Sequence, residues 1–261
     1  MAKTYAYVGI DLGFAKKKRL PVVVCTLKGA SLIPLLLKKR SYAKPPIGSG
    51  NRGALEQKVV SKFSKDVLDY LGYIERKENL EIRRIAIDAP KNYKHCNKIR
   101  RSAEKAMDSM RISCFATPSR TEFEKIIEKA KGHLATGGAE NRIPHANQLW
   151  MLVGFSLFEV LSARYECIEV FPQAIVNVLK SAKDHKTTSK GIEAQLDAIA
   201  IQTGWPTDAK TRLEFESISY RSRHDKLDAY MSAWVASLSE EERKPCGEPP
   251  DDVIWVPHIE E

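Results

Sequence analysis

The chain has 261 residues, of which 43% are hydrophobic and 29% are charged. This composition excludes a disordered polymer, and the length allows one large domain or two small ones. Lys and Arg number 42 against 33 Asp and Glu, a formal net charge of +9 that favours a polyanionic partner such as nucleic acid without indicating a fold.

The five cysteines have no C-x-x-C spacing, which argues against a structural zinc site and a disulfide framework. They are typical of free thiols in a reducing cytoplasm. The longest apolar stretch, residues 149–163, is too short to span a membrane and contains Glu159. We therefore expect a cytoplasmic protein that makes no membrane contact.

The first third of the chain predicts three strands, a loop, a helix and a fourth strand, in that order. The strands are expected at 5–13, 20–27, 31–40 and 82–90, the loop at 44–53 and the helix at 55–78. The short connections between the first three strands favour an antiparallel meander. Pro90 stops the fourth strand.

The remainder is largely helical in pattern. Residues 94–163 are expected to form a helical insertion with one strand at 112–119, followed by a strand at 166–172 and helices at 192–205 and from about 224 onward. This order predicts a single α/β domain over residues 1–261, with a mixed central sheet flanked by helices and a helical insertion before the last strand.

Acidic residues end two of the apolar strands. Asp11 closes the first strand and Asp88 the fourth, although Asp is rare in strands and its burial is costly unless it is hydrogen-bonded, paired or metal-bound. A single such residue is usually a turn former. Glu169, inside the strand at 166–172, fits an outward-facing position as well as a functional one.

Two further acids, Asp225 and Asp228, begin the last helix three residues apart and therefore share one face. They could simply be a helix cap and a first-turn acid. If the first and fourth strands are neighbours, however, all four carboxylates can meet, and divalent cations usually neutralise such a group. Two Mg²⁺ or Mn²⁺ ions about 3.5–4 Å apart would support phosphodiester hydrolysis.

The order of these acids resembles the RNase H-like superfamily, and the D-x-x-D-A start of the last helix is similar to that of Holliday-junction resolvases. Four motifs, GIDLG (9–13), AIDAP (86–90), ECIEVFPQA (166–174) and HDKLDAYMSAWVA (224–236), resemble the domain of unknown function 429 (DUF429), a family of predicted RNase H-like nucleases. This resemblance implies an RNase H-like fold. It also implies metal ligation by Asp11, Asp88, Asp225 and Asp228, with Glu169 as a second-rank catalytic candidate.

Basic residues follow two of the acids. One run lies in the turn after Asp11, and an arginine pair follows Asp88. Such residues favour phosphate contact and salt-dependent binding, although a solvated turn is the more common explanation of the first run and a helix surface explains the arginine pair equally well. The candidates for nucleic-acid binding are Lys16, Lys17, Lys18, Arg19, Arg100 and Arg101. His224 could assist proton transfer or act as a capping residue.

The expected function is a metal-dependent nuclease acting on DNA or RNA. One alternative is a small-molecule kinase of the actin-like ATPase superfamily, because residues 9–17 resemble a phosphate-binding strand and turn. Such kinases need two related lobes and a late Gly-rich loop, and the sequence predicts neither. The other alternative is a non-catalytic nucleic-acid-binding module in which the acids are caps and turn residues.

Overall fold

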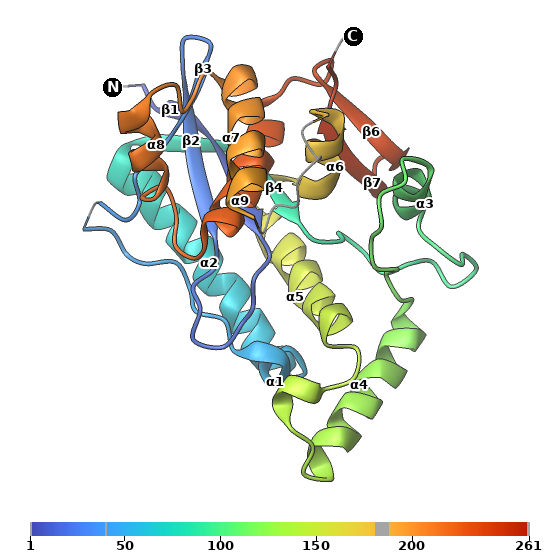
Figure 1. Ribbon diagram of the computed structural model, residues 1–261. Coiled ribbons are helices and arrows are strands. Elements are labelled where there is room, and N and C mark those ends of the chain that lie inside the picture. The colour runs from blue at the N-terminus through green and yellow to red at the C-terminus, as the bar shows by residue number, and fades with distance from the viewer. Residues whose placement is uncertain (1, 40, 181–187, 260–261) are drawn as a thin grey trace.

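A computed structural model describes residues 2–39, 41–180 and 188–259. Its centre is a five-stranded sheet with the order β3-β2-β1-β4-β5 (Figure 1). The strands are β1 (Thr4–Asp11), β2 (Val22–Lys28), β3 (Ser31–Pro34), β4 (Leu80–Asp88) and β5 (Glu166–Glu169). The β1–β2 and β2–β3 pairs are antiparallel, whereas β1–β4 and β4–β5 are parallel.

This architecture confirms the predicted α/β class with a mixed central sheet, and the strand order is consistent with an RNase H-like fold. The predicted strand at 112–119 is wrong, because those residues form no strand. Ile112 is buried in a hydrophobic cluster with the helix Ser102–Ser109 (α3), and the backbone N–H of Thr117 donates to the Glu104 carboxylate. These contacts hold the segment against a helix, so it does not join the sheet.

Helices cover both faces of the sheet. The helices are α1 (Gly50–Ala54), α2 (Gln57–Glu78), α3 (Ser102–Ser109), α4 (Arg120–Ala135), η1 (Glu140–Arg142), α5 (Ala146–Leu161), α6 (Pro172–Val178), α7 (Ser189–Thr203), α8 (Ala209–Phe215) and α9 (Arg223–Ser237). One hydrophobic cluster joins α2 and α5 to one face, and a second joins α6, α7 and α9 to the other. The sheet is therefore the middle of three layers.

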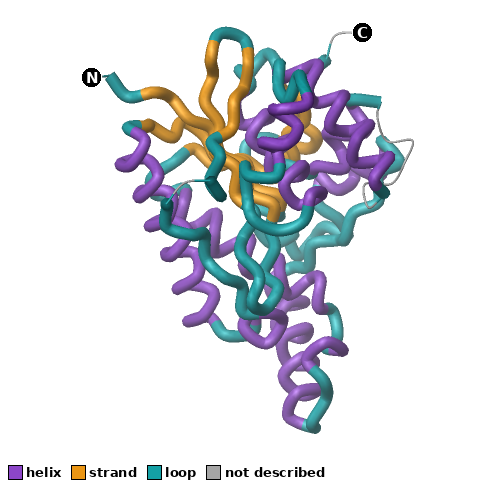
Figure 2. Tube along the Cα trace, turned by 60° about the vertical axis from the view of Figure 1, so that its left-hand side comes forward, coloured by secondary structure: helices purple, strands orange, loops and turns teal. Residues whose placement is uncertain are grey.

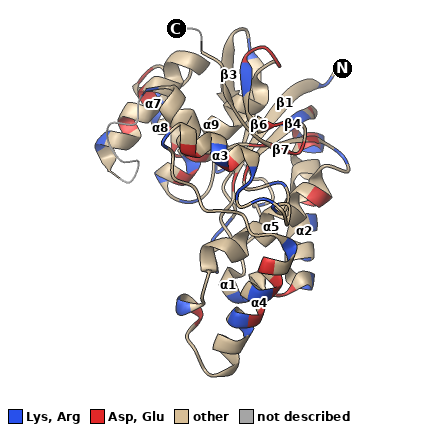
Figure 3. Cartoon of the chain, turned by 90° about the vertical axis from the view of Figure 1, so that its right-hand side faces the viewer, with Lys and Arg blue, Asp and Glu red and all other residues tan. Residues whose placement is uncertain are grey.

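The predicted helical insertion corresponds to α3, α4 and α5. Figures 1 and 2 show α4 extending away from the sheet, at the opposite end of the molecule from β3. Basic and acidic residues are interspersed along α4 and α2 (Figure 3). After α9, strands β6 (Arg243–Glu248) and β7 (Asp252–Pro257) form an antiparallel hairpin. Within the described residues, no helix is both long and apolar enough to cross a membrane.

Side chains of β1 alternate between the two helical layers. Val8 and Ile10 are fully buried in the cluster that contains α2 and α5. Gly9 faces α9, where a Cβ atom would lie 1.9 Å from the carbonyl oxygen of Ala229 and 2.4 Å from the backbone nitrogen of Ala233. The backbone of α9 therefore lies directly on the backbone of β1, at a distance that only glycine permits.

This contact predicts that Gly9→Ala is strongly destabilising. Both opposing atoms belong to a buried helix backbone that cannot move aside locally, so we expect a loss of about 3 kcal/mol or more in the free energy of unfolding. Denaturant unfolding measures this loss. The matched control is Gly132→Ala in α4, where a Cβ would meet no atom within 4 Å. That variant should be as stable as wild type or gain up to about 1 kcal/mol. Equal stability of the two variants would contradict the packing argument.

Candidate functional site

Asp11 and Asp88 lie side by side at the carboxyl edge of the sheet. They are direct partners in the parallel pairing of β1 with β4, whose backbones are about 4.8 Å apart. Strand alternation places both side chains on the face that α9 covers, because Gly9 contacts α9 and Ala86 belongs to the same cluster as that helix. Both aspartates are partly exposed. The expected pairing of the first and fourth strands is therefore confirmed.

The start of α9 lies over this edge. Ala229 packs on Gly9, whereas the carbonyl oxygens of Ala236 and Leu238, at the other end of the helix, accept hydrogen bonds of 2.9 and 2.8 Å from Arg84 Nη1. Arg84 is four residues before the end of β4, so α9 runs antiparallel to β1 and β4. The first turn of α9, with its two acids, is consequently at the same edge as the aspartate pair.

Asp225 is held by groups at the start of its own helix. The N-cap of α9 is Ser222, and the Asp225 carboxylate accepts hydrogen bonds of 3.1 Å from the Ser222 backbone N–H and 3.1 Å from Arg221 Nε. Burial alone would raise the pKa of this carboxyl, but the Ser222 hydrogen bonds and the Arg221 charge hold it below its usual value. Asp228, one turn later, is also buried, with 3% of its surface exposed.

Two groups beside Asp225 are placed to act at this edge. Arg221 approaches the turn after β1, since a Cβ on Gly13 would be 3.4 Å from its Nη1. That nitrogen is buried and has no hydrogen-bond partner among the described residues. His224 is partly exposed, and its Nε2 is 3.3 Å from Asp225 Oδ1. Sequence reasoning missed Arg221, whose only signal was its position four residues before Asp225.

The acids at this edge are the candidate metal ligands of the described residues. Within the described part of the chain, no three His, Cys, Asp or Glu side chains form a group that could hold a metal ion. Mg²⁺, however, keeps several waters and often binds through one or two carboxylates together with substrate phosphates. Asp11 and Asp88 meet that smaller demand, whereas ligation by all four aspartates stays a prediction.

Strand alternation places the Glu169 side chain on the opposite face of the sheet from the aspartate pair. Glu169 is the register partner of Ile87, whose side chain faces α2 and α5 rather than α9. Its carboxylate accepts two hydrogen bonds from Arg101, of 2.9 and 2.7 Å, and one of 2.7 Å from the Lys91 backbone N–H. Burial raises the pKa of Glu169, and Arg101 and Lys91 oppose that rise. Both side chains of the ion pair are at least 95% buried.

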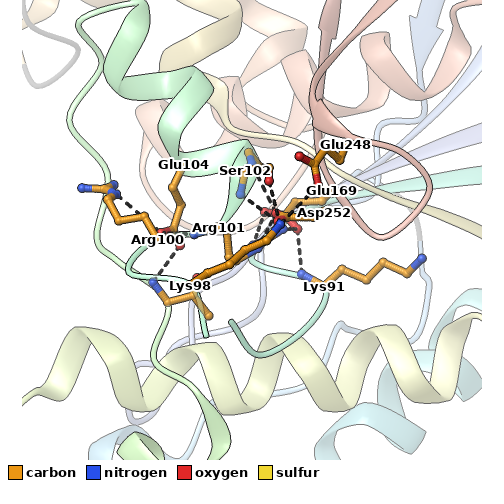
Figure 4. A network of polar contacts seen from close by, with 11 residues as sticks. Lys91, Lys98, Arg100, Arg101, Ser102, Glu104, Glu169, Glu248 and Asp252 are labelled. Atoms are coloured by element: carbon orange, nitrogen blue, oxygen red, sulfur yellow. Dashed lines mark hydrogen bonds and ion pairs between the residues drawn. The ribbon is translucent and has the colours of Figure 1, made fainter. Parts of the chain in front are cut away.

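Arg101 also binds the C-terminal hairpin. Its Nε donates to Asp252 Oδ1 at 3.1 Å, and Asp252 Oδ2 accepts from the backbone N–H of Ser102 at 2.7 Å (Figure 4). Asp252 thus satisfies the free N–H groups at the start of α3. Arg100 binds Cys114 and, at 3.2 Å, the Asp108 carboxylate. The structure therefore gives both arginines partners within the protein, and a phosphate role for them stays a prediction.

The basic turn lies after β1, as expected. Lys16, Lys17 and Lys18 are exposed. The turn is paired with the following loop through isolated bridges from Lys16 to residue 48 and from Arg19 to residue 47. Arg19 Nη1 donates to the carbonyl oxygen of residue 45 at 2.8 Å. The three lysines are thus presented on an anchored turn.

A cavity of about 360 Å³ lies beside Asp88. The ends of three parallel strands contribute Leu12, Asp88 and Glu169 to its lining. Aromatic side chains from other elements complete it, among them Trp150 of α5 and Phe115 of the segment between α3 and α4. The sequence did not reveal this cavity, because residues far apart in the chain form it.

The depressed pKa of Asp225 predicts a pH-dependent effect of Asp225→Asn. Ionised Asp225 stabilises the folded state above its unfolded pKa of about 3.9, and this stabilisation is lost as the pH falls through the lower folded value. We expect the variant to lose about 1–2 kcal/mol of unfolding free energy at pH 7. The difference from wild type should shrink below about pH 4.

Denaturant unfolding at several pH values measures this effect. The control is Asp66→Asn in α2, an exposed acid paired with Lys62, which should change stability by no more than about 0.5 kcal/mol at any pH. A pH-independent loss in Asp225→Asn would show that its charge is not the stabilising element.

The sequence matches the family model described as Protein of unknown function (DUF429) over residues 9–252. No curated protein and no solved structure matches it significantly. The match covers both Asp11 and Asp88 and extends past the end of α9. The chain therefore belongs to the DUF429 family.

Proposed function

We propose that this protein is a divalent-metal-dependent nuclease that hydrolyses phosphodiester bonds of DNA or RNA. The observation that carries the proposal is the direct pairing of Asp11 with Asp88 at the carboxyl edge of two parallel strands. Two carboxylates in adjacent register offer oxygen ligands that one divalent cation can share. An edge where strands end and a helix begins is also a common place for binding sites in open α/β sheets.

Asp11 and Asp88 would hold Mg²⁺ or Mn²⁺. When bound, the ion lowers the pKa of the attacking water and takes charge from the leaving oxygen. Both cations prefer hard oxygen ligands, which the two carboxylates supply. Asp228, buried in the first turns of α9 at the same edge, is the next candidate ligand.

Arg221 is the best-placed cation for the scissile phosphate. Its buried Nη1 lies beside Gly13, two residues after Asp11, and has no partner among the described residues. An unsatisfied buried guanidinium N–H costs free energy, and a phosphate oxygen would satisfy it with a charge-assisted bond. Asp225 fixes the other side of the guanidinium through Nε. Arg221 would thus bind a phosphate that the aspartates reach only through a cation.

The first test is metal-dependent cleavage of labelled single-stranded and double-stranded DNA and RNA. Wild type should cleave at least one substrate with Mg²⁺ or Mn²⁺ and should stop on chelation. Asp11→Asn and Asp88→Asn keep side-chain size but remove the charge that holds the cation, so each should lower the rate about a hundredfold or more. Thermal melts should change little.

Two further variants, a control and a candidate metal ligand, are tested in the same cleavage assay. The control Asp66→Asn should cleave like wild type, because Asp66 pairs with Lys62 on α2, remote from the edge. Asp228→Asn should lose activity if Asp228 binds metal and keep it if that residue is an ordinary acid of the first turns. No cleavage of any substrate, or equal rates for Asp11→Asn and wild type, would reject the proposal.

The second test is the salt dependence of nucleic-acid binding. Exchange of Lys16, Lys17 and Lys18 for Gln should weaken binding and lower the slope of log affinity against log salt by about 2 to 3, because each lysine that contacts phosphate releases counterions. Fluorescence anisotropy at several salt concentrations measures the slope.

The matched control exchanges Lys3, Lys28 and Lys77 for Gln. The first two lysines flank the opposite edge of the sheet, where β1 begins and β2 ends, and Lys77 lies at the end of α2. All three lysines are exposed. Equal slopes for the two triple variants would show that the basic turn does not contact the nucleic-acid backbone.

A further inference from the structure

Aromatic side chains line the cavity beside Asp88, and they differ in how firmly the protein holds them. Phe115 is 63% exposed, although a large apolar side chain gains by burial. Trp150 is partly buried, and its orientation is fixed because its Nε1 donates to Asn51 Oδ1 at 2.8 Å. Phe171, two residues after the end of β5, is a third aromatic in the lining. Fixed and exposed rings around one cavity are suited to a flat, unsaturated ligand.

The charged residues that line the cavity would repel an anionic ligand. Carboxylates from Asp88, Glu104 and Glu169 line the cavity. Among the described lining residues the cation is Arg101, and its guanidinium is already bound to Glu169 and Asp252. A phosphate entering this space would meet an excess of negative charge. A neutral ring would meet none of this repulsion.

A polar group is available to bind the edge of such a ring. Asn147, at the start of α5, is exposed and lines the cavity. Its amide can donate and accept hydrogen bonds at the same time, as the edges of nucleobases require. The volume of about 360 Å³ is at the lower end for small-molecule sites and too small for a stacked base pair with its backbone.

We propose that this cavity receives one unstacked nucleobase, so that the substrate is single-stranded or contains an unpaired nucleotide. The inference rests on the proposed nuclease function, because it places the sugar–phosphate backbone across Asp11 and Asp88 while the adjoining base enters between Phe115 and Trp150. A base inside a duplex remains stacked on its neighbours and reaches such a cavity only when it is extruded. Aromatic stacking is tolerant of sequence, so the site selects unpaired structure rather than a particular base.

The test compares two labelled ten-nucleotide strands, oligothymidylate and a strand with the same sugar–phosphate backbone but no bases. Binding is measured by fluorescence anisotropy at low salt in EDTA, so that the strands stay intact. Wild type should bind the base-bearing strand about fivefold or more tightly than the base-free strand, the ratio expected for one stacked base. Phe115→Ala should bring this ratio close to one.

The matched control is Leu213→Ala on α8. Leu213 is 75% exposed and does not line the cavity, so the variant should keep the wild-type ratio. A second measurement uses the four tryptophans of the chain. The base-bearing strand should quench tryptophan emission in wild type, and Trp150→Phe should lose that quenching while still binding the strand.

The outcomes separate this inference from the nuclease proposal. Equal affinity for the two strands, an unchanged ratio in Phe115→Ala, or the same quenching in Trp150→Phe would overturn the base-binding cavity. Cleavage of the base-free strand at the rate of the base-bearing one would also overturn it and would leave the nuclease proposal standing. Base-dependent binding with no cleavage under Mg²⁺ or Mn²⁺ would support the cavity and reject the nuclease proposal.

Discussion

The close contact between α9 and Gly9 determines where the candidate site is. A side chain at position 9 would push the helix away from the sheet, because a Cβ there would be 1.9 Å from the Ala229 carbonyl oxygen. Asp225 lies about 6 Å before Ala229 along the helix, and Asp11 lies about 6.6 Å after Gly9 along the strand. Because the helix and the strand are antiparallel, the two distances run in the same direction. The Gly9 contact therefore brings the start of α9 level with the end of β1. Every residue of α9 from Asp225 to Ala236 is buried, so the helix is held on all sides.

A buried ion-pair network fixes the carboxyl edge of the sheet beside β5. The buried Arg101 guanidinium joins β5 through Glu169 to the β6–β7 hairpin through Asp252, and Asp252 in turn caps α3. Removing one partner of a buried pair leaves an uncompensated charge that costs about 3–5 kcal/mol. The network thus holds three elements around the cavity and keeps its lining in place without contributing a metal ligand. The sequence order of these residues, which suggests a phosphate-binding arginine, gives no sign of this role.

The sequence predicts the parts of the site that depend on periodicity. Asp11 and Asp88 end apolar strands, and the apolar spacing of α9 places Asp225 and Asp228 at its start, so the strand ends and the first turn of the helix follow from local pattern. The side-chain direction of Glu169 does not follow from local pattern, because the register of a four-residue strand is undetermined until β4 is placed beside it. The position of Arg221 is not predictable from the sequence either. Its φ of 89° is a left-handed conformation that is rare for Arg and is set by tertiary contacts. The burial of Lys226 is not predictable from the helix pattern either, because its partner Glu216 lies outside the helix.

The distribution of charge gives the edge its chemical character. The chain as a whole is basic, with a formal charge of +9, but the carboxyl edge of the sheet gathers Asp11, Asp88 and the acids of α9. A polyanion attracted by the exposed lysines of the turn after β1 would therefore meet repulsion at the point where the backbone must come closest. In the proposed function, a divalent cation on the aspartate pair would reverse the local sign and attract the phosphate, whereas the neutral base would avoid the repulsion in the neighbouring cavity. The proposed attraction of nucleic acid at the rim and the proposed dependence on a cation at the centre would thus have one origin, the arrangement of these side chains.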